Sequence, residues 1–370
     1  MADNLSLRVL VVDDTIIYRK VVSDVLKEIP GVKVIGSAQN GKVAISMIER
    51  LKPDLITLDV EMPEMNGLQV LEEIKKRGLD VGVVMVSTLT QRGAETTMRA
   101  LELGAFYFIP KPETGSMEES KKAISSSIEP IIKAFSSKKK IKRLLSKGRP
   151  ATPTGKEETK EATQQSTVLR QPKLRDKKVR SEVVAIGVST GGPNALAEVI
   201  PRLPGDLGVP VLIVQHMPPL FTACLAKNLN SKSSLEVVEA KDGVEIRPNY
   251  VYIAPGGKQM KIASARGNRS KHIKITDDPP ENNCKPSADY LFRSVAHTYK
   301  SKATGVIMTG MGSDGTLGLK LMKRFGATII AQNEESCVVF GMPKKPIEEG
   351  IADLVSPLDQ IATEIVKTVK

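Results

Sequence analysis

The 370-residue sequence has no tryptophan, only seven phenylalanines and six tyrosines, three cysteines and three histidines. So few aromatic side chains leave little to stack on nucleic-acid bases. The cysteines are odd in number and far apart, which indicates reduced thiols in the cytoplasm rather than a disulfide framework. Cysteine and histidine are also too sparse for a zinc site of the usual spacing.

Long apolar runs are missing as well. None reaches the length of a spanning helix, and the start "MADNLSLRVL" lacks a basic region followed by an apolar stretch. We therefore expect no membrane insertion and no signal peptide.

The net charge of +12 is concentrated in one segment. Residues 1–112 carry a net charge of −1, residues 113–180 of +10 and residues 181–370 of +3. The middle segment is rich in Lys, Thr, Pro and Gln, with few apolar residues and no sustained period. This composition predicts a solvated, flexible basic linker, and no nucleic-acid partner is expected.

Apolar runs alternate with helical patterns on both sides of that segment, which predicts an α/β fold with two doubly wound parallel sheets. We expect three parts: residues 1–125, a helix end and basic linker over 126–180, and a second domain over 181–370. The expected strands of the first part are 7–14, 32–39, 54–60, 81–88 and 105–112. A last helix is expected over about 117–136, and the stretch "KKIKRLL" could extend it. Those of the second are 182–189, 209–216, 250–255, 303–310 and 327–333, with a hairpin excursion within 235–276.

Carboxylates follow two strands of the first domain. Asp13 and Asp14 end the first strand, and Asp59 ends the third. Because the carboxyl ends of parallel strands meet at one edge, these groups should converge and bind a hard divalent cation, most plausibly Mg²⁺. Ser87 and Lys111 end the fourth and fifth strands, where a hydroxyl and an ammonium would suit a transferred phosphoryl group.

This combination resembles the receiver domain of two-component response regulators, a flavodoxin-like fold. The resemblance implies that Asp59 accepts a phosphoryl group from a histidine kinase. It further implies roles for six other residues: Asp13, Asp14 and the carbonyl of Glu61 as Mg²⁺ ligands beside Asp59, and Ser87, Phe108 and Lys111 as sensors of phosphorylation.

In the second domain, "GVSTGG" matches the turn G-x-S-x-G that exposes a nucleophilic serine, Ser189. The same letters would fit a phosphate-binding turn at a helix N-terminus, or a serine that caps a helix starting near Asn194. The two usual glycine fingerprints of nucleotide sites are absent, which weakens the phosphate interpretation.

A nucleophilic serine needs a base, and the three histidines limit the choice. His216 ends the strand 209–216 on the same predicted edge as Ser189, whereas His272 and His297 fall within a strand and a helix. Asp314 follows a third strand in a glycine-rich loop. The order Ser, His, Asp differs from that of α/β-hydrolases, so we expect a triad on another doubly wound, Rossmann-like scaffold.

Six stretches, from "AIGVSTGGP" through "KPSADYLFRSVA" to "AQNEESCVVFGMPK", resemble the chemotaxis protein-glutamate methylesterases over 182–370. The resemblance implies a Ser189–His216–Asp314 triad with oxyanion donors near Met311 and His216. It also implies phosphorylation-activated hydrolysis of glutamate methyl esters, with glutamine deamidation, on methyl-accepting chemotaxis receptors. A chemotaxis histidine kinase would be the partner, and the esterase chemistry would need no cofactor.

Two features depart from the family pattern. Gln259 stands where relatives often have histidine, a position expected at the pocket rim, and the linker is longer and more basic than usual. Two alternatives remain open at this point: a phosphorylation-switched binding module without catalysis, or the same hydrolase chemistry on a protein outside chemotaxis.

Overall fold

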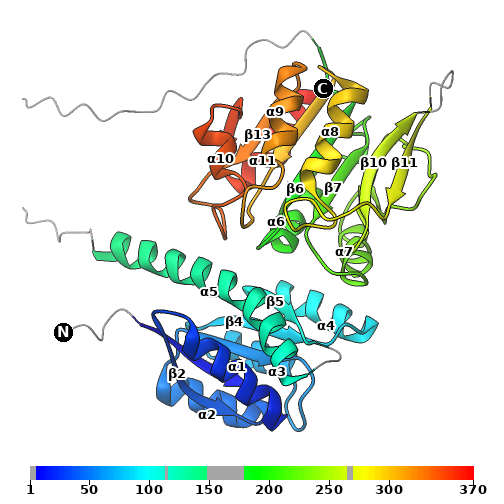
Figure 1. The fold of residues 1–370 in the computed structure, drawn as a ribbon. Helices are drawn as coiled ribbons and strands as arrows, with labels where there is room; N and C mark the ends of the chain where they lie inside the picture. The colour runs from blue at the N-terminus through cyan, green and yellow to red at the C-terminus, as the bar shows by residue number, and fades with distance from the viewer. Residues whose placement is uncertain (1–5, 113–115, 148–178, 265–269) are drawn as a thin grey trace, which may run out of the picture.

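The chain forms two α/β units, each built on its own parallel sheet (Figure 1). The structure, a computed structural model, describes residues 6–112, 116–147, 179–264 and 270–370. Residues 148–178 of the predicted linker lie outside this description. Among the described residues, no helix combines the length and apolar character needed to cross a membrane.

The first sheet has five strands in the order β2-β1-β3-β4-β5, all parallel, which confirms the predicted doubly wound sheet. The strands are β1 (Leu7–Val12), β2 (Val32–Ala38), β3 (Leu55–Asp59), β4 (Gly82–Ser87) and β5 (Tyr107–Pro110). The helices are α1 (Ile16–Glu28), α2 (Gly41–Leu51), α3 (Gly67–Lys76), α4 (Gln91–Glu102) and α5 (Met117–Lys147).

Local sequence accounts for where these elements begin. The side chain of Asn40 accepts the N–H of Val43 and starts α2, and Asn66 forms a reciprocal capping box with Gln69 at the start of α3. The central strand β3 is buried along its whole length, as expected for a strand covered by helices on both faces.

Helix α5 is longer than predicted. It was expected to end at about residue 136 but continues to Lys147. The extension "SSKKKIKRLLSK" contains good helix formers and neither glycine nor proline before Gly148. The change in composition at Ser137 was therefore a poor marker of the helix end.

The second sheet has seven parallel strands in the order β14-β13-β12-β6-β7-β9-β8. They are β6 (Val183–Val188), β7 (Val211–Gln215), β8 (Glu236–Glu239), β9 (Tyr250–Ile253), β12 (Ala303–Ile307), β13 (Thr328–Gln332) and β14 (Leu354–Ser356). The helices are α6 (Gly192–Val199) with a 3₁₀ turn (Ile200–Arg202), α7 (Phe221–Asn230), α8 (Ala288–Tyr299), α9 (Thr316–Arg324), α10 (Lys344–Glu348) and α11 (Leu358–Val369).

Two details of this sheet differ from expectation. The segment 235–240 was assigned to the hairpin excursion, but β8 joins the main sheet as an edge strand parallel to β9. The hairpin consists of β10 (Gln259–Ser264) and β11 (Lys271–Thr276), which pair antiparallel. The three-residue strand β14 was not predicted, because so short a segment has no readable periodicity.

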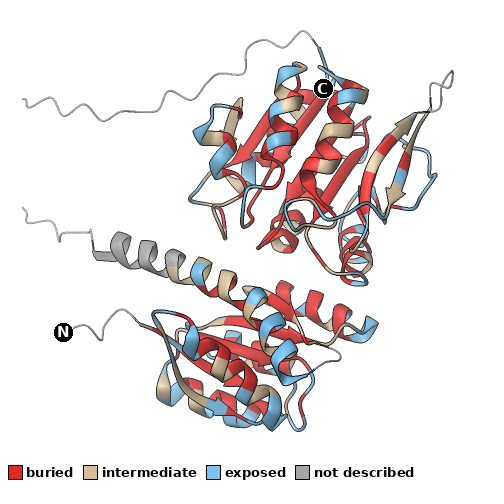
Figure 2. Cartoon of the chain, viewed as in Figure 1, coloured by how far each residue is buried: buried red, intermediate tan, exposed pale blue. Residues whose placement is uncertain are grey.

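The central strands of the second sheet are buried along their whole length (Figure 2), and successive residues of a strand join the cores on opposite faces. On β6, Val183 and Ala185 join the core beneath α8 and α9, whereas Val184 and Ile186 join the core on the opposite face of the sheet, with α6, α7 and α11. The sheet is therefore covered on both faces, and a binding site is expected at the carboxyl ends of its strands.

Phe292 of α8 connects that helix to the end of β6. It is fully buried, and its side chain occupies the space left by the missing side chains of Gly187, Gly315 and Gly318. A Cβ on any of the three would lie within about 3.1 Å of Phe292 atoms. This close packing positions the N-terminus of α8 against the loop after β12.

The two units contact one another through the first unit's α4 and β5. Helix α4 packs on α7, and the rings of Phe108 and Phe221 stack with centroids 4.6 Å apart. Glu102 accepts hydrogen bonds from Asn228 (2.6 Å) and Lys232. The carboxyl edge of the second sheet therefore faces the first unit.

Replacing Phe292 by alanine should destabilise the second unit by about 3–5 kcal/mol, because it leaves a cavity that three glycines cannot fill. The free energy of unfolding would be measured from urea transitions followed by circular dichroism. Leu317→Ala, at a residue 61% exposed, is the control and should change it by less than about 0.5 kcal/mol. Equal effects of the two substitutions would contradict this packing.

Candidate active site

Ser189 lies on a sharp turn between β6 and α6. Its N–H donates to the carbonyl of Thr309 at 3.0 Å, and Gly191 adopts a left-handed conformation (φ +79°) as the N-cap of α6. The helix starts at Gly192 and is capped by glycine. The interpretation of Ser189 as a helix cap is therefore wrong.

Gln215, which has no recognisable signal in the sequence, contacts the main chain of the turn that carries Ser189. Its side-chain amide donates to the carbonyls of Ser189 (3.0 Å) and His216 (3.2 Å). A Cβ at Gly192 would lie 1.9 Å from Oε1 of Gln215, so glycine is required at this position. One buried amide thus positions the main chain of both residues.

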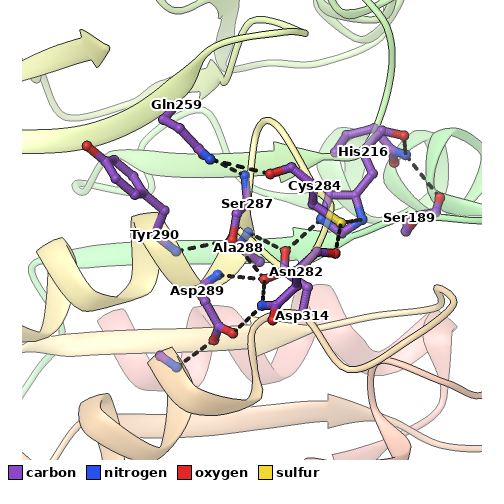
Figure 3. A network of polar contacts seen from close by, with 12 residues as sticks. Ser189, His216, Gln259, Asn282, Cys284, Ser287, Ala288, Asp289, Tyr290 and Asp314 are labelled. Carbon is purple, nitrogen blue, oxygen red and sulfur yellow. Dashed lines mark hydrogen bonds and ion pairs between the residues drawn. The ribbon is translucent and has the colours of Figure 1, made fainter. Parts of the chain in front are cut away.

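His216 and Asp314 form a direct pair (Figure 3). Nε2 of His216 lies 2.8 Å from Oδ2 of Asp314, and Asp314 is only 2% exposed. Burial raises the pKa of Asp314, but the hydrogen bond and charge of His216 act together with the hydrogen bonds from Asn282 and Ala288 and lower it to about 2. For His216, burial lowers the pKa, while Asp314 and then Cys284 raise it to about 9.

Four further donors hold the Asp314 carboxylate. The N–H groups of Ala288 (2.6 Å) and Asp289 (3.2 Å) come from the first turn of α8. The hydroxyl of Ser287 (2.8 Å) and the amide of Asn282 (2.9 Å) complete the set. Such dense donation to a buried carboxylate stabilises its ionised form and fixes its orientation.

Ser189, His216 and Asp314 follow the neighbouring strands β6, β7 and β12 at one carboxyl edge (Figure 3), and His216 and Asp314 are in direct contact. The N–H of His216 donates to the carbonyl of Val188 at 3.2 Å, so it is not available to an oxyanion. Gly310 approaches Ser189 closely, since a Cβ there would lie 2.8 Å from Cβ of Ser189. Met311 follows in this loop, next to the turn.

Gln259 is not at a pocket rim. It is fully buried; its Oε1 accepts the N–H of Ser287 (2.8 Å), and its Nε2 donates to the carbonyls of Pro279 (3.1 Å) and Cys284 (3.3 Å). The expected rim position is wrong, because the β10-β11 hairpin folds over the loop that carries Cys284. Cys284 itself, unassigned from the sequence, has its Sγ 3.7 Å from Nδ1 of His216.

In the first unit, Lys111 bridges two of the predicted carboxylates. Its ammonium lies 2.8 Å from Asp13 and 2.7 Å from Asp59, and all three side chains are buried. Burial raises the pKa of Asp59 to about 6, although Lys111 opposes this shift. For Lys111, burial lowers the pKa, but Asp59 and Asp13 together raise it by more, so the net pKa lies above its usual value.

Ligand oxygens of Asp13, Asp14 and Asp59 lie within 4.8 Å of one another, a spacing that fits a hard divalent cation. The N–H of Glu61 donates to Asp59 (3.4 Å), and Asp14 and Glu61 line a cavity of about 610 Å³ at this edge. Ser87 is buried at the end of the neighbouring strand β4, with its hydroxyl donating to the carbonyl of Gly93.

Strand β5 joins the two sites. Lys111 follows its end at the carboxylates, whereas Phe108 stacks on Phe221 and Tyr107 contacts Thr190, the residue after Ser189. Burial raises the pKa of Tyr107 at this contact. The first unit therefore covers the turn that carries Ser189.

Comparison with known proteins matches each of the two units to a protein family. Residues 184–365 match the family model "CheB methylesterase", and residues 9–124 match "Response regulator receiver domain". Proteins named protein-glutamate methylesterase/protein-glutamine glutaminase from Desulfotalea psychrophila and Bacillus subtilis are 53% and 44% identical. The alignments cover 99% and 98% of this chain, respectively, and 99% of each relative.

A crystal structure of the Thermotoga maritima CheB methylesterase catalytic domain is 45% identical and has a TM-score of 0.49. The alignment covers 51% of this chain and 99% of the chain in the crystal structure. From the two family matches and the full-length relatives, we conclude that this chain belongs to the CheB methylesterase family and carries a response regulator receiver domain.

Proposed function

We propose that Ser189, His216 and Asp314 hydrolyse the γ-methyl esters of glutamate residues on methyl-accepting chemotaxis receptors and deamidate specific receptor glutamines. The observation that carries this proposal is the 2.8 Å contact between His216 and Asp314 at the sheet edge where Ser189 also lies, in a chain of this family. The proposed hydrolysis needs no cofactor, because these three side chains supply the nucleophile and transfer the protons.

The proposed reaction begins when Oγ of Ser189 attacks the ester carbonyl carbon and its proton passes to Nδ1 of His216. Nε2–H donates to Asp314, so Nδ1 is the ring nitrogen that would accept that proton. Because the pKa of His216 is raised to about 9, only the neutral fraction of the imidazole acts as the base, and this fraction grows as the pH rises toward 9. The N–H of Met311 would stabilise the oxyanion. His216 returns the proton to the methoxide oxygen, and methanol leaves.

Hydrolysis of the acyl-enzyme repeats these steps with water. His216 takes a proton from the water as its oxygen bonds to the acyl carbon, and the Ser189 oxygen leaves with that proton. The product is a glutamate carboxylate, whether the substrate is a methyl ester or a glutamine amide.

We further propose that Asp59 is the phosphoacceptor, with a chemotaxis histidine kinase as donor and Mg²⁺ held by Asp13, Asp14, Asp59 and the carbonyl of Glu61. Bound Mg²⁺ would neutralise charge on the phosphoryl oxygens. An oxygen of Asp59 bonds to phosphorus as the P–N bond of the kinase phosphohistidine breaks and the imidazole takes a proton. Lys111 pairs with the charge that develops, and Ser87 and Phe108 respond to it.

The chain is proposed to divide into a receiver (1–125), a helix end and linker (126–180) and a catalytic domain (181–370). The contacts of Tyr107, Phe108 and Glu102 with the catalytic domain support an inhibitory docking of the unphosphorylated receiver. Phosphorylation of Asp59 would shift the population away from this arrangement.

Ser189→Ala should reduce methanol release from methylated receptor membranes by about 10⁴–10⁶-fold, because the nucleophile is lost. Ser313→Ala, in the exposed loop before Asp314, is the matched control and should retain activity. Methanol release by Ser189→Ala at the control's rate would reject the mechanism.

Asp59→Asn should abolish activation by a small-molecule phosphodonor while leaving the basal rate of methanol release measurable, because the acceptor carboxylate is lost. The measurement compares rates with and without phosphodonor in the presence of Mg²⁺. Activation that survives in this variant would place the control site elsewhere.

Glu102→Lys should raise the basal rate of the unphosphorylated protein severalfold, because the new charge repels Lys232 across the interface. Glu49→Lys reverses a charge that is paired with Arg77 within the receiver, and it should leave the basal rate unchanged. A basal rate that Glu102→Lys does not raise would argue against inhibition by docking.

A further inference from the structure

The thiol of Cys284 has no role in the proposed reaction, yet it lies beside the catalytic imidazole (Figure 3). Its Sγ is 3.7 Å from Nδ1 of His216, the nitrogen opposite the one that contacts Asp314. The turn that presents it includes Asn282 and Asn283, both with positive φ, and Asn282 is itself anchored on Asp314. The position of the thiol is therefore set by the same network that orients His216.

This spacing matches a pair of metal ligands. In a tetrahedral zinc site, Zn–N of about 2.0–2.1 Å and Zn–S of about 2.3 Å place nitrogen and sulfur roughly 3.5–3.7 Å apart. Ligand atoms of His216, Cys284 and Asp314 all lie within 4.8 Å of one another. Asp314 contacts the other ring nitrogen, which is how carboxylates orient a zinc-bound histidine from behind.

We propose that Nδ1 of His216 and Sγ of Cys284 bind Zn²⁺, with water in the remaining positions. A thiolate and an imidazole favour a borderline-soft ion such as zinc over Mg²⁺ or Ca²⁺, which prefer oxygen ligands. On binding, the thiol proton passes to solvent, and the imidazole binds as its neutral form. The His216 side chain is 14% exposed and Cys284 is half-buried, so solvent reaches the pair in part while the first unit is docked.

Zinc at this position would inhibit the esterase. Nδ1 is the nitrogen that accepts the proton of Ser189, so a bound metal removes the base; this consequence rests on the proposed triad. The ion would act separately from the receiver's carboxylates, which are oxygen ligands suited to Mg²⁺. Free zinc would thus be a second inhibitory input, independent of phosphorylation.

The test uses the full chain with excess Mg²⁺ to occupy the receiver site. Co²⁺, a spectroscopic substitute for zinc, should bind with one thiolate-to-metal charge-transfer band, and Zn²⁺ should displace it. Cys284→Ser should lose the band and raise the zinc concentration for half-inhibition of methanol release at least about tenfold, relative to its own zinc-free rate. Cys224→Ser and Cys337→Ser, at the two other cysteines, are the matched controls and should behave as wild type.

A cobalt band or zinc sensitivity that persists unchanged in Cys284→Ser would overturn the site. Zinc that binds through Cys284 without slowing methanol release would overturn the inhibition and count against His216 as the base. If no metal binds but Ser189→Ala still abolishes hydrolysis, the zinc site fails while the proposed function stands. Thermal melts of each metal-free variant establish that it is folded.

Discussion

The hydrogen bonds to the buried carboxylate of Asp314 are the interactions on which the second unit's active site depends. An ionised carboxylate that is 2% exposed is stable only if donors surround it. Those donors come from three separate places: the first turn of α8, the turn around Asn282, and His216 at the end of β7. Satisfying one charge therefore fixes the relative positions of a helix, a turn and a sheet edge, and the active site follows from that arrangement.

The receiver also contains a buried charge surrounded by partners, but there the central charge is positive. There a buried ammonium, Lys111, is held by Asp13 and Asp59 from two other strands. Each charge lies at the carboxyl edge of a parallel sheet, where strand ends converge. Strand β5 carries Tyr107 and Phe108, which contact the second unit, and ends directly before Lys111, so one short strand lies between the two centres.

Strand-end chemistry was predictable from the sequence because parallel strands share one carboxyl edge. Asp13, Asp59, Lys111, Ser189, His216 and Asp314 each lie at the end of an apolar run that reads as a strand. In the structure Lys111 contacts Asp13 and Asp59, His216 contacts Asp314, and Ser189 lies at the same edge as that pair. Asn282, Cys284 and Gln215 were not found, because their roles depend on how loops and the β10-β11 hairpin pack in three dimensions. Ser287 did carry a local signal, a serine directly before a helical pattern. The edge placement of β8 depended on tertiary pairing, which composition does not reveal, whereas the stretch "KKIKRLL" did indicate that α5 could be longer.

The close approach of Gly192 to Gln215 also constrains how this active site can diverge. With only 1.9 Å between a Cβ at one position and the amide oxygen at the other, the two residues cannot vary independently. A side chain at 192 becomes tolerable only after 215 shortens, and a shorter residue at 215 releases the main chain of both Ser189 and His216. A side chain at position 192 therefore disturbs the amide that holds the Ser189 turn unless residue 215 changes with it.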